Sequence, residues 1–190
     1  MKKRGSADKL AKMAVMAALS VVLLLLIRIP FPPAPFLVYD PADIPIYIAA
    51  FAFGPVSILI AFVVCFIQAF ILGGDGIYGF LMHFIATGAF ALLVGRMYQR
   101  NKTRKTAVIS LIVGALLITA IMCAMNLVVT PVFMGVPRSV VAKMIVPTII
   151  PFNLLKTGIN GVVTFLVYKR VSRFLHGEIR TGEAKANKEI

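Results

Sequence analysis

The sequence predicts an all-α integral membrane protein that forms a single six-helix bundle. Hydrophobic residues make up 60% of the 190 residues and charged residues only 14%, whereas a typical soluble domain has about a quarter charged residues. The mean hydropathy is +0.95. Apolar residues also fall into six runs of roughly helical length. We expect 10–175 to form the membrane domain, between a basic cytoplasmic segment, 1–9, and a flexible cytoplasmic tail, 176–190.

The expected helices follow these apolar runs in order. The first follows basic residues without a small-residue cleavage site, so we interpret it as a retained helix and not as a signal peptide. The second is too short to span a bilayer and stops at Phe53-Gly54-Pro55, so its backbone must be shielded by protein. The other four are bounded by glycine, proline or basic residues. The predicted ranges are 10–29, 43–53, 55–72, 78–98, 106–130 and 151–174.

The basic residues indicate the orientation of the bundle. Five Lys and Arg residues lie before or at the start of the first span, five lie around the connection between the fourth and fifth spans, and six lie at or after the end of the last span, which is 16 of the 20. Loops rich in Lys and Arg stay in the cytoplasm, so both termini are expected there. The net charge of +13 is then a topology signal that favours contact with anionic lipid headgroups. We therefore expect no nucleic-acid partner.

The first extracellular loop is expected to be structured. Its sequence, "RIPFPPAPFLVYD" at 28–40, contains four stiffening prolines and adds the aromatic side chains of Phe36 and Tyr39. Such a loop could form the wall or lid of a site for a flat, partly polar ligand. Asp40, the last residue of this loop, and Asp43 flank the outer start of the second segment. They fit either ligand contact or a helix start with Asp40 as the N-cap, and both alternatives stay open.

Polar side chains of the predicted spans gather in the outer half of the membrane. Asn153, Lys156 and Asn160 share one face of the sixth span, at i, i+3 and i+7. Asn126 and His83 lie near the outer ends of spans five and four. A buried ammonium costs roughly 2.5–3.5 kcal/mol at the bilayer centre unless it is paired or hydrated. Lys156 therefore indicates a solute site, with snorkelling to the interface as the alternative.

Other classes of protein fit the sequence less well. The inner half of the spans offers only weak hydroxyls, which favours a cup open to the outside over a channel. No GxxxxGK[ST] motif is present, so energy for transport must come from a partner. Cys65 and Cys123 are isolated, and we predict no metal site, no cofactor and no catalytic residue. A small intramembrane enzyme using His83, or a subunit that binds no ligand, are the alternatives.

Four segments resemble the riboflavin-binding S components of energy-coupling factor (ECF) transporters. They are "YDPADIPIYIAAFAFGP" at 39–55, "GGDGIYGF" at 73–80, "TPVFMG" at 130–135 after Asn126, and "IIPFNLLKTG" at 149–158. The resemblance covers roughly 10–175. It implies a six-helix protein of the bacterial plasma membrane that binds riboflavin, as transported ligand, from outside. The ligand would then pass to an ECF module of one transmembrane coupling protein and two ATPase subunits.

The resemblance also implies roles for particular residues. In that family the flavin is held by the first loop and helices four to six, and the polar contacts correspond to Asn126, Asn153 and Lys156. Docking on the coupling protein uses small residues of helix one, which correspond to Ala14 and Ala18 in "AVMAA", with Ala11 on the same face. An S component for another vitamin or small aromatic solute is the main alternative.

Overall fold

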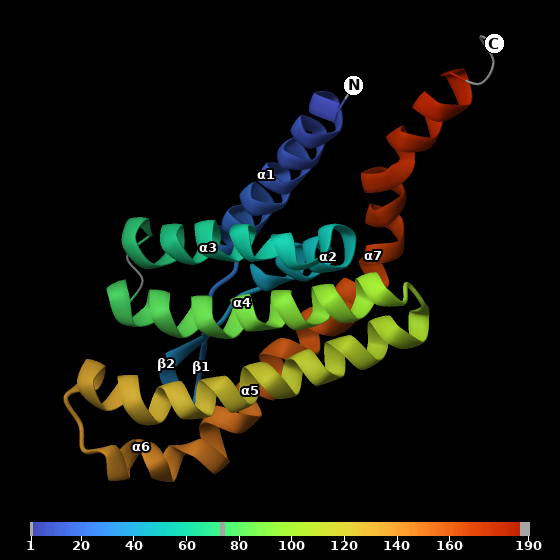
Figure 1. The fold of residues 1–190 in the computed structure, drawn as a ribbon. Coiled ribbons are helices and arrows are strands. Elements are labelled where there is room, and N and C mark those ends of the chain that lie inside the picture. Colours follow the sequence, from blue (N-terminus) through green and yellow to red (C-terminus); the bar gives the residue numbers. More distant parts are fainter. Residues whose placement is uncertain (1, 73–74, 187–190) are drawn as a thin grey trace.

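The structure, a computed structural model, describes residues 2–72 and 75–186, and most of them are helical (Figure 1). Five helical stretches are long and apolar enough to cross a membrane: Ala7–Leu26, Asp43–Ile71, Gly76–Arg100, Arg104–Met134 and Arg138–Tyr168. The prediction of a mostly helical protein with membrane-spanning segments is confirmed. The elements are α1 Lys2–Leu26, β1 Ile29–Phe31, β2 Ala34–Tyr39, α2 Asp43–Phe53, the 3-10 turn η1 Gly54–Ser57, α3 Ile58–Phe66, the π-helical η2 Ile67–Ile71, α4 Gly76–Arg100, α5 Arg104–Met134, α6 Arg138–Met144, the π-helical η3 Ile145–Ile149 and α7 Ile150–Ala186.

The proline-rich loop corrects the prediction of an all-α protein, because it forms an antiparallel hairpin of β1 and β2. Ile29 lies opposite Tyr39 and Pro30 opposite Val38, and the register shifts after Pro30. Both strands are edge strands of a two-stranded sheet. A proline there need not lose a hydrogen bond, since its missing N–H can face away from the partner strand.

The ends of most predicted helices differ from the structure, those of the first and last helices by the most. α1 ends at Leu26, three residues before the predicted end of the first span. The last helical stretch begins at Arg138 instead of 151, because α6 and η3 precede α7. Pro147 lies within η3, where a π-helical turn accommodates the missing N–H. The tail predicted at 176–190 is helical through Ala186, and 187–190 lie outside the described residues.

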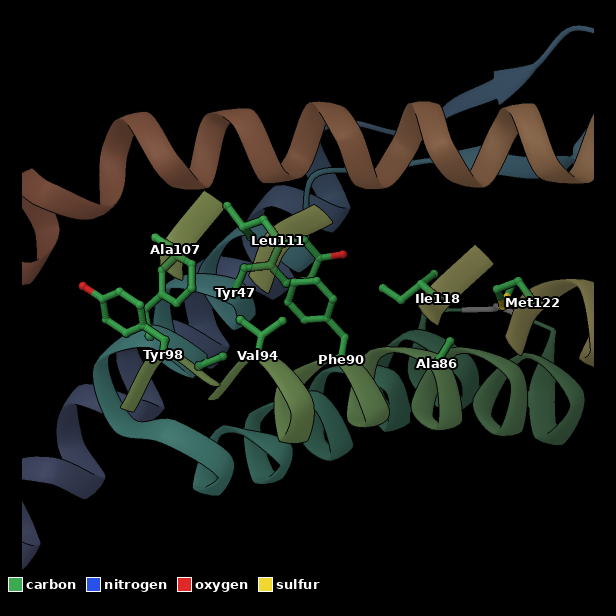
Figure 2. Packing of buried hydrophobic residues seen from close by; sticks show 11 residues of the cluster. Tyr47, Ala86, Phe90, Val94, Tyr98, Ala107, Leu111, Ile118 and Met122 are labelled. Carbon is green, nitrogen blue, oxygen red and sulfur yellow. The ribbon is translucent and has the colours of Figure 1, made fainter. Parts of the chain in front are cut away.

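Helix α2 lies inside the bundle. Its bounds are those predicted, and eight of its 11 residues are buried. The ring of Tyr47 stacks on Phe90 of α4, with ring centroids 3.8 Å apart. Figure 2 shows this cluster, in which Ala86, Phe90, Val94 and Tyr98 follow one another along α4. The expectation that protein shields this short segment is confirmed.

A tight turn after α2 packs directly against α4. Gly54 has φ of 72°, a conformation that favours glycine, and it breaks the helix between α2 and α3. A Cβ on Gly95 of α4 would lie 2.6 Å from the carbonyl carbon of Gly54. The Nε2 of Gln99 donates to the carbonyl oxygens of Phe51, at 2.7 Å, and Ala52, at 3.3 Å. Carbonyls at the end of α2 therefore have partners inside the protein.

Short connections align the long helices of the bundle. Residues 101–103 join α4 to α5, and 135–137 join α5 to α6, so each pair runs antiparallel. The N-terminal part of α1 and the C-terminal part of α7 extend away from the other helices on the same side of the molecule (Figure 1). The start of α4 and the end of α5 therefore lie together, at the end of the bundle opposite the α4–α5 turn.

We predict that Gly95→Ala destabilises the protein, because the added methyl group meets backbone that cannot move aside; overpacking typically costs about 1–3 kcal/mol. Gly158→Ala is the matched control, since a Cβ at that helical position meets nothing within 4 Å. Thermal unfolding of the two detergent-purified variants checks the prediction. Equal unfolding temperatures would contradict the close approach of η1 to α4.

Candidate solute-binding site

A cavity of about 240 Å³ lies at the end of the bundle where α4 starts and α5 ends. Its walls come from β2, η2, α4, α5 and the start of α7. The apolar lining combines aliphatic residues of β2, such as Leu37 and Val38, with aromatic and sulfur-containing side chains, which include Phe36, Met82, Met122, Phe133 and Phe152. The polar lining consists of Arg28, Gln68, Asp75, His83, Asn126 and Thr130. Flat rings with polar edges suit such a mixture of aromatic, thioether and amide groups.

Asn126 is the buried amide of this cavity, with 1% of its surface exposed. Its Nδ2 donates to the carbonyl oxygen of Met122 at 2.7 Å, and its Oδ1 accepts from the hydroxyl of Thr130 at 2.8 Å. These bonds fix the orientation of the amide. An asparagine amide carries two N–H donors and two acceptor lone pairs, so one of each can still meet a ligand.

Lys156 lies in a separate network beside the cavity. Its Nζ is 2.8 Å from Oδ2 of Asp40 and 3.8 Å from Oδ2 of Asp43, and the lysine and Asp40 side chains are nearly inaccessible to solvent. The Oδ1 of Asp40 accepts the backbone N–H of Ala42 at 3.1 Å. Thr87 of α4 donates to Oδ1 of Asp43 at 3.3 Å. The network therefore joins α7, the start of α2 and α4.

The end of the hairpin belongs to the same network. The hydroxyl of Tyr39 donates to Oδ1 of Asn160 at 3.2 Å, and Nδ2 of Asn160 donates to the carbonyl oxygen of Asp40 at 3.3 Å. Partial burial, and then the neighbouring Asp40 carboxylate, raise the pKa of Tyr39, so its hydroxyl stays protonated and can donate. Two consecutive hairpin residues are thereby fastened to α7.

The charge state of Asp40 follows from this geometry. Burial alone would raise the pKa of Asp40, but the Lys156 ammonium outweighs it and holds that pKa below its usual range. A carboxyl with a lowered pKa stabilises the fold above its ordinary titration range, and this stabilisation is lost as the pH falls through the lowered pKa. The ion pair is therefore fully formed at neutral pH.

The structure separates the predicted site residues into two groups. Phe36, His83 and Asn126 line the cavity. Tyr39, Asp40, Lys156 and Asn160 form the network beside it. Asn153 belongs to neither group. Its Nδ2 donates to the carbonyl oxygen of Ile149, at 2.8 Å, across the junction of η3 and α7.

Asp40 is not the N-cap of α2. The cap residue is Ala42, which makes no side-chain capping bond, and Asp40 instead closes a turn just before the helix. The expected position of the cap was wrong because the helix starts later, at Asp43. The two oxygens of Asp40 have different partners: Oδ1 accepts the Ala42 N–H, and Oδ2 pairs with Lys156, 116 positions away.

The sequence analysis did not single out several of the lining residues. Arg28 follows an apolar run and resembles a flanking charge, while Thr130 and Met122 resemble ordinary helix residues. Met122 and Thr130 lie four residues before and after Asn126, so these three residues share one face of α5. That periodicity was the one usable signal.

The predicted docking alanines lie on an exposed face of α1. Ala11, Ala14 and Ala18 are all exposed. Ala14 and Ala18 line an apolar groove together with Leu59 and Val63 of α3, and Ala11 does not border it. Small side chains at these positions leave room for the close approach of another helix.

A bundle of helices long and apolar enough to cross a membrane, with a small mixed cavity at one end, is typical of a membrane protein that binds a solute. The chain belongs to the ECF transporter substrate-specific component family, whose family model matches residues 8–168. Members of this family are substrate-binding subunits of transporters and not enzymes, so the intramembrane-enzyme alternative is set aside.

Known members of the family resemble the chain over most of its length. The riboflavin transporter RibU of Staphylococcus aureus (strain TCH60) is 29% identical, covering 88% of this chain and 92% of that protein. The riboflavin transporter FmnP of Bacillus subtilis (strain 168) is 26% identical, covering 88% and 95%. The solved structure described as the S component of a bacterial ECF transporter superposes with a TM-score of 0.76 at 28% identity, covering 90% of this chain and 98% of that one.

We predict that Lys156→Met lowers the unfolding temperature more than Asp40→Ala. Removing the lysine leaves two carboxylates without a cation, whereas removing Asp40 leaves Lys156 with Asp43 at 3.8 Å. An unpaired buried charge typically costs about 3–5 kcal/mol. Lys143→Met, at an exposed lysine of α6, is the control and should change little. Equal losses at Lys156 and Asp40 would show that Asp43 does not share the ammonium.

Proposed function

We propose that the protein is the riboflavin-capturing subunit of an ECF transporter in the bacterial plasma membrane. The observation that carries the proposal is the cavity, whose aromatic and thioether walls surround the fixed amide of Asn126. A flavin ring is flat and apolar on its faces, with hydrogen-bonding groups along one edge. The names of the similar transporters support riboflavin as the ligand.

The proposed orientation has six crossings, with both termini in the cytoplasm. α2 and α3 count as separate segments because the chain breaks at Gly54 between them. The α4–α5 turn and the helix ends beside it carry Arg100, Lys102, Arg104 and Lys105, which favours the cytoplasmic side. Because the cavity lies at the opposite end of the bundle, it would open toward the outside, with the β-hairpin beside its mouth.

Within the cavity, Asn126 would bind a polar edge of the flavin through its remaining N–H and lone pair. Phe36 of the hairpin and Phe152 of α7 would contact the ring faces or edges. His83 and Gln68 would contact polar atoms of the ligand. Asn153 adjoins Phe152 and would help to set that wall of the cavity.

Delivery would depend on partner subunits. The sequence has no GxxxxGK[ST] motif, so ATP hydrolysis would come from the two ATPases of an ECF module, acting through its transmembrane coupling protein. The groove between α1 and α3, with Ala14 and Ala18, is the proposed docking face. Membrane lipids would cover the remaining exposed apolar helix faces.

Riboflavin titration of the detergent-purified protein tests the proposed ligand. We expect one riboflavin per protein, with quenching of flavin fluorescence, and we expect Asn126→Leu to weaken binding at least about tenfold because it removes a hydrogen-bonding amide from an otherwise apolar wall. Asn101→Leu, in the α4–α5 turn, is the matched control. No quenching by the wild-type protein would reject riboflavin and direct the search to other vitamins.

Substitutions on α1 test the docking face. We expect Ala14→Trp and Ala18→Trp to abolish riboflavin uptake by cells while riboflavin binding by the purified variants is unchanged, because both alanines line the groove and neither lines the cavity. Ala120→Trp, at an exposed alanine of α5, controls for a bulky side chain facing lipid. Normal uptake by both α1 variants would show that the partner docks elsewhere.

A further inference from the structure

A second apolar groove lies between α5 and α7, on the outside of the bundle. Its volume is about 340 Å³, and its lining residues lie within 108–115 of α5 and 157–166 of α7. Among these described residues only Thr157 is polar, and its hydroxyl donates to the carbonyl oxygen of Asn153 at 2.6 Å. The groove therefore offers an occupant apolar contacts almost alone.

Two glycines of α7 open this groove. A Cβ on Gly158 would meet nothing within 4 Å, and a Cβ on Gly161 would come no closer than 3.9 Å to Leu111. By contrast, a Cβ on Gly114 of α5 would collide with the ring of Phe90, so close packing of two helices requires that glycine. The glycines of α7 instead leave a depression in a helix surface that faces lipid.

The length of the groove suits a lipid acyl chain. A helix rises about 1.5 Å per residue, so the lining extends about 11 Å along α5 and about 14 Å along α7. One leaflet of the hydrocarbon core is about 15 Å thick. One turn before Gly158, α7 exposes the bulky side chain of Leu154, so the depression ends near the middle of the bundle. A partner's transmembrane helix would have to pass over Leu154, whereas an acyl chain ends there.

Basic side chains lie at one end of the groove. Arg104 lies one turn before the first lining residue of α5, and Arg170 lies one turn after the last lining residue of α7, so each shares a helix face with the lining. Both are exposed. Tyr168 packs edge-on against Tyr98 of α4, with ring centroids 5.5 Å apart, so Arg170 lies at the level of the α4–α5 turn. The two arginines therefore lie at the same end of the bundle.

No carboxylate that the structure describes neutralises these arginines. The four acidic side chains among the described residues all lie elsewhere: Asp8 pairs with Lys12, Asp40 and Asp43 lie beside Lys156, and Asp75 lines the cavity at the opposite end. An apolar groove thus ends in positive charge that needs an anion from outside the chain.

We propose that the α5–α7 groove binds an anionic phospholipid, with one acyl chain against Gly158 and Gly161 and the phosphate group at Arg104 and Arg170. Anionic lipids are attracted to basic residues next to membrane-spanning segments, and a guanidinium can donate two parallel hydrogen bonds to a phosphate. In the proposed orientation this lipid belongs to the cytoplasmic leaflet. The site goes beyond the proposed function, since it faces lipid and requires no riboflavin.

Tryptophan fluorescence tests the site directly, because the chain has no tryptophan. Leu166→Trp introduces one at an exposed lining residue, and Val15→Trp introduces one on an exposed face of α1 outside the groove. Each variant would be placed in phosphatidylcholine nanodiscs with a fixed fraction of brominated phosphatidylglycerol or brominated phosphatidylcholine, since bromine quenches nearby indoles. We expect phosphatidylglycerol to be preferred at least about threefold in the Leu166→Trp protein, and less in the Val15→Trp protein, which reports on bulk lipid.

Charge removal tests the headgroup contact in the Leu166→Trp protein. We expect Arg104→Gln combined with Arg170→Gln to lower the preference for phosphatidylglycerol to that of the Val15→Trp protein. Arg96→Gln combined with Arg100→Gln removes the same number of charges from α4 and is the matched control. Equal effects of the two pairs would overturn the proposal, because they would show attraction to the whole basic surface and not to this site.

Filling the groove tests the acyl-chain contact. We expect Gly158→Leu in the Leu166→Trp protein to lower the preference in the same way, because the added side chain occupies open space. Ala120→Leu, at an exposed position of α5 outside the groove, is its control. An unchanged preference in the Gly158→Leu protein would overturn the groove as the seat of the lipid.

The quenching itself distinguishes the other possible occupants. Equal quenching by the two brominated lipids in the Leu166→Trp protein would overturn the proposal in favour of ordinary bilayer contact. Quenching by neither lipid would overturn it in favour of a second copy of the chain covering the groove. Because riboflavin is absent from all these measurements, they stay decisive even if the protein fails to bind riboflavin.

Discussion

The structure around the cavity depends on one constraint, which is that an ammonium buried among apolar helices needs a carboxylate partner. Lys156 lies on α7, and its partner, Asp40, precedes α2 by only three residues. Bringing them within 2.8 Å brings the end of the hairpin and the start of α2 against α7. Asp43 and Thr87 extend the contact to α4. The segment that joins the hairpin to α2 thus meets α4 and α7 at this pair, and the cavity lies beside the meeting point.

A second contact acts at the other end of α2. The Gly54 turn lies against Gly95, and Gln99 donates to the last carbonyls of α2, so both ends of this short helix are fixed by α4 or α7. A helix of 11 residues could not hold its place in a bilayer by length alone. Fixed at both ends, it fills the centre of the bundle with Tyr47 and Phe51.

The sequence alone was sufficient for the long helices and insufficient for the contacts between them. The bounds of α2 were predicted, and those of α4 to within two residues at each end, because glycine, proline or basic residues interrupt their apolar runs. The hairpin was missed because its prolines favour extended loops as much as strands. The helical turns of α6 and η3 were missed because Pro147 and Pro151 suggested a late start. Lys156 was recognised as unusual, but its partner lies 116 positions away, and no local pattern links the two.

The same packing explains why the polar residues stop halfway along the bundle. Along α4, the cavity uses Tyr78, Met82 and His83, and the following turns of the helix place Ala86, Phe90, Val94 and Tyr98 in the aromatic core. Along α5, Met122 belongs to both sets, so it marks the floor of the cavity. The stacked rings of Tyr47 and Phe90 lie beyond this floor. A solute in the cavity therefore meets close-packed side chains on its way toward the α4–α5 turn. Its passage to that side therefore requires the helices to rearrange.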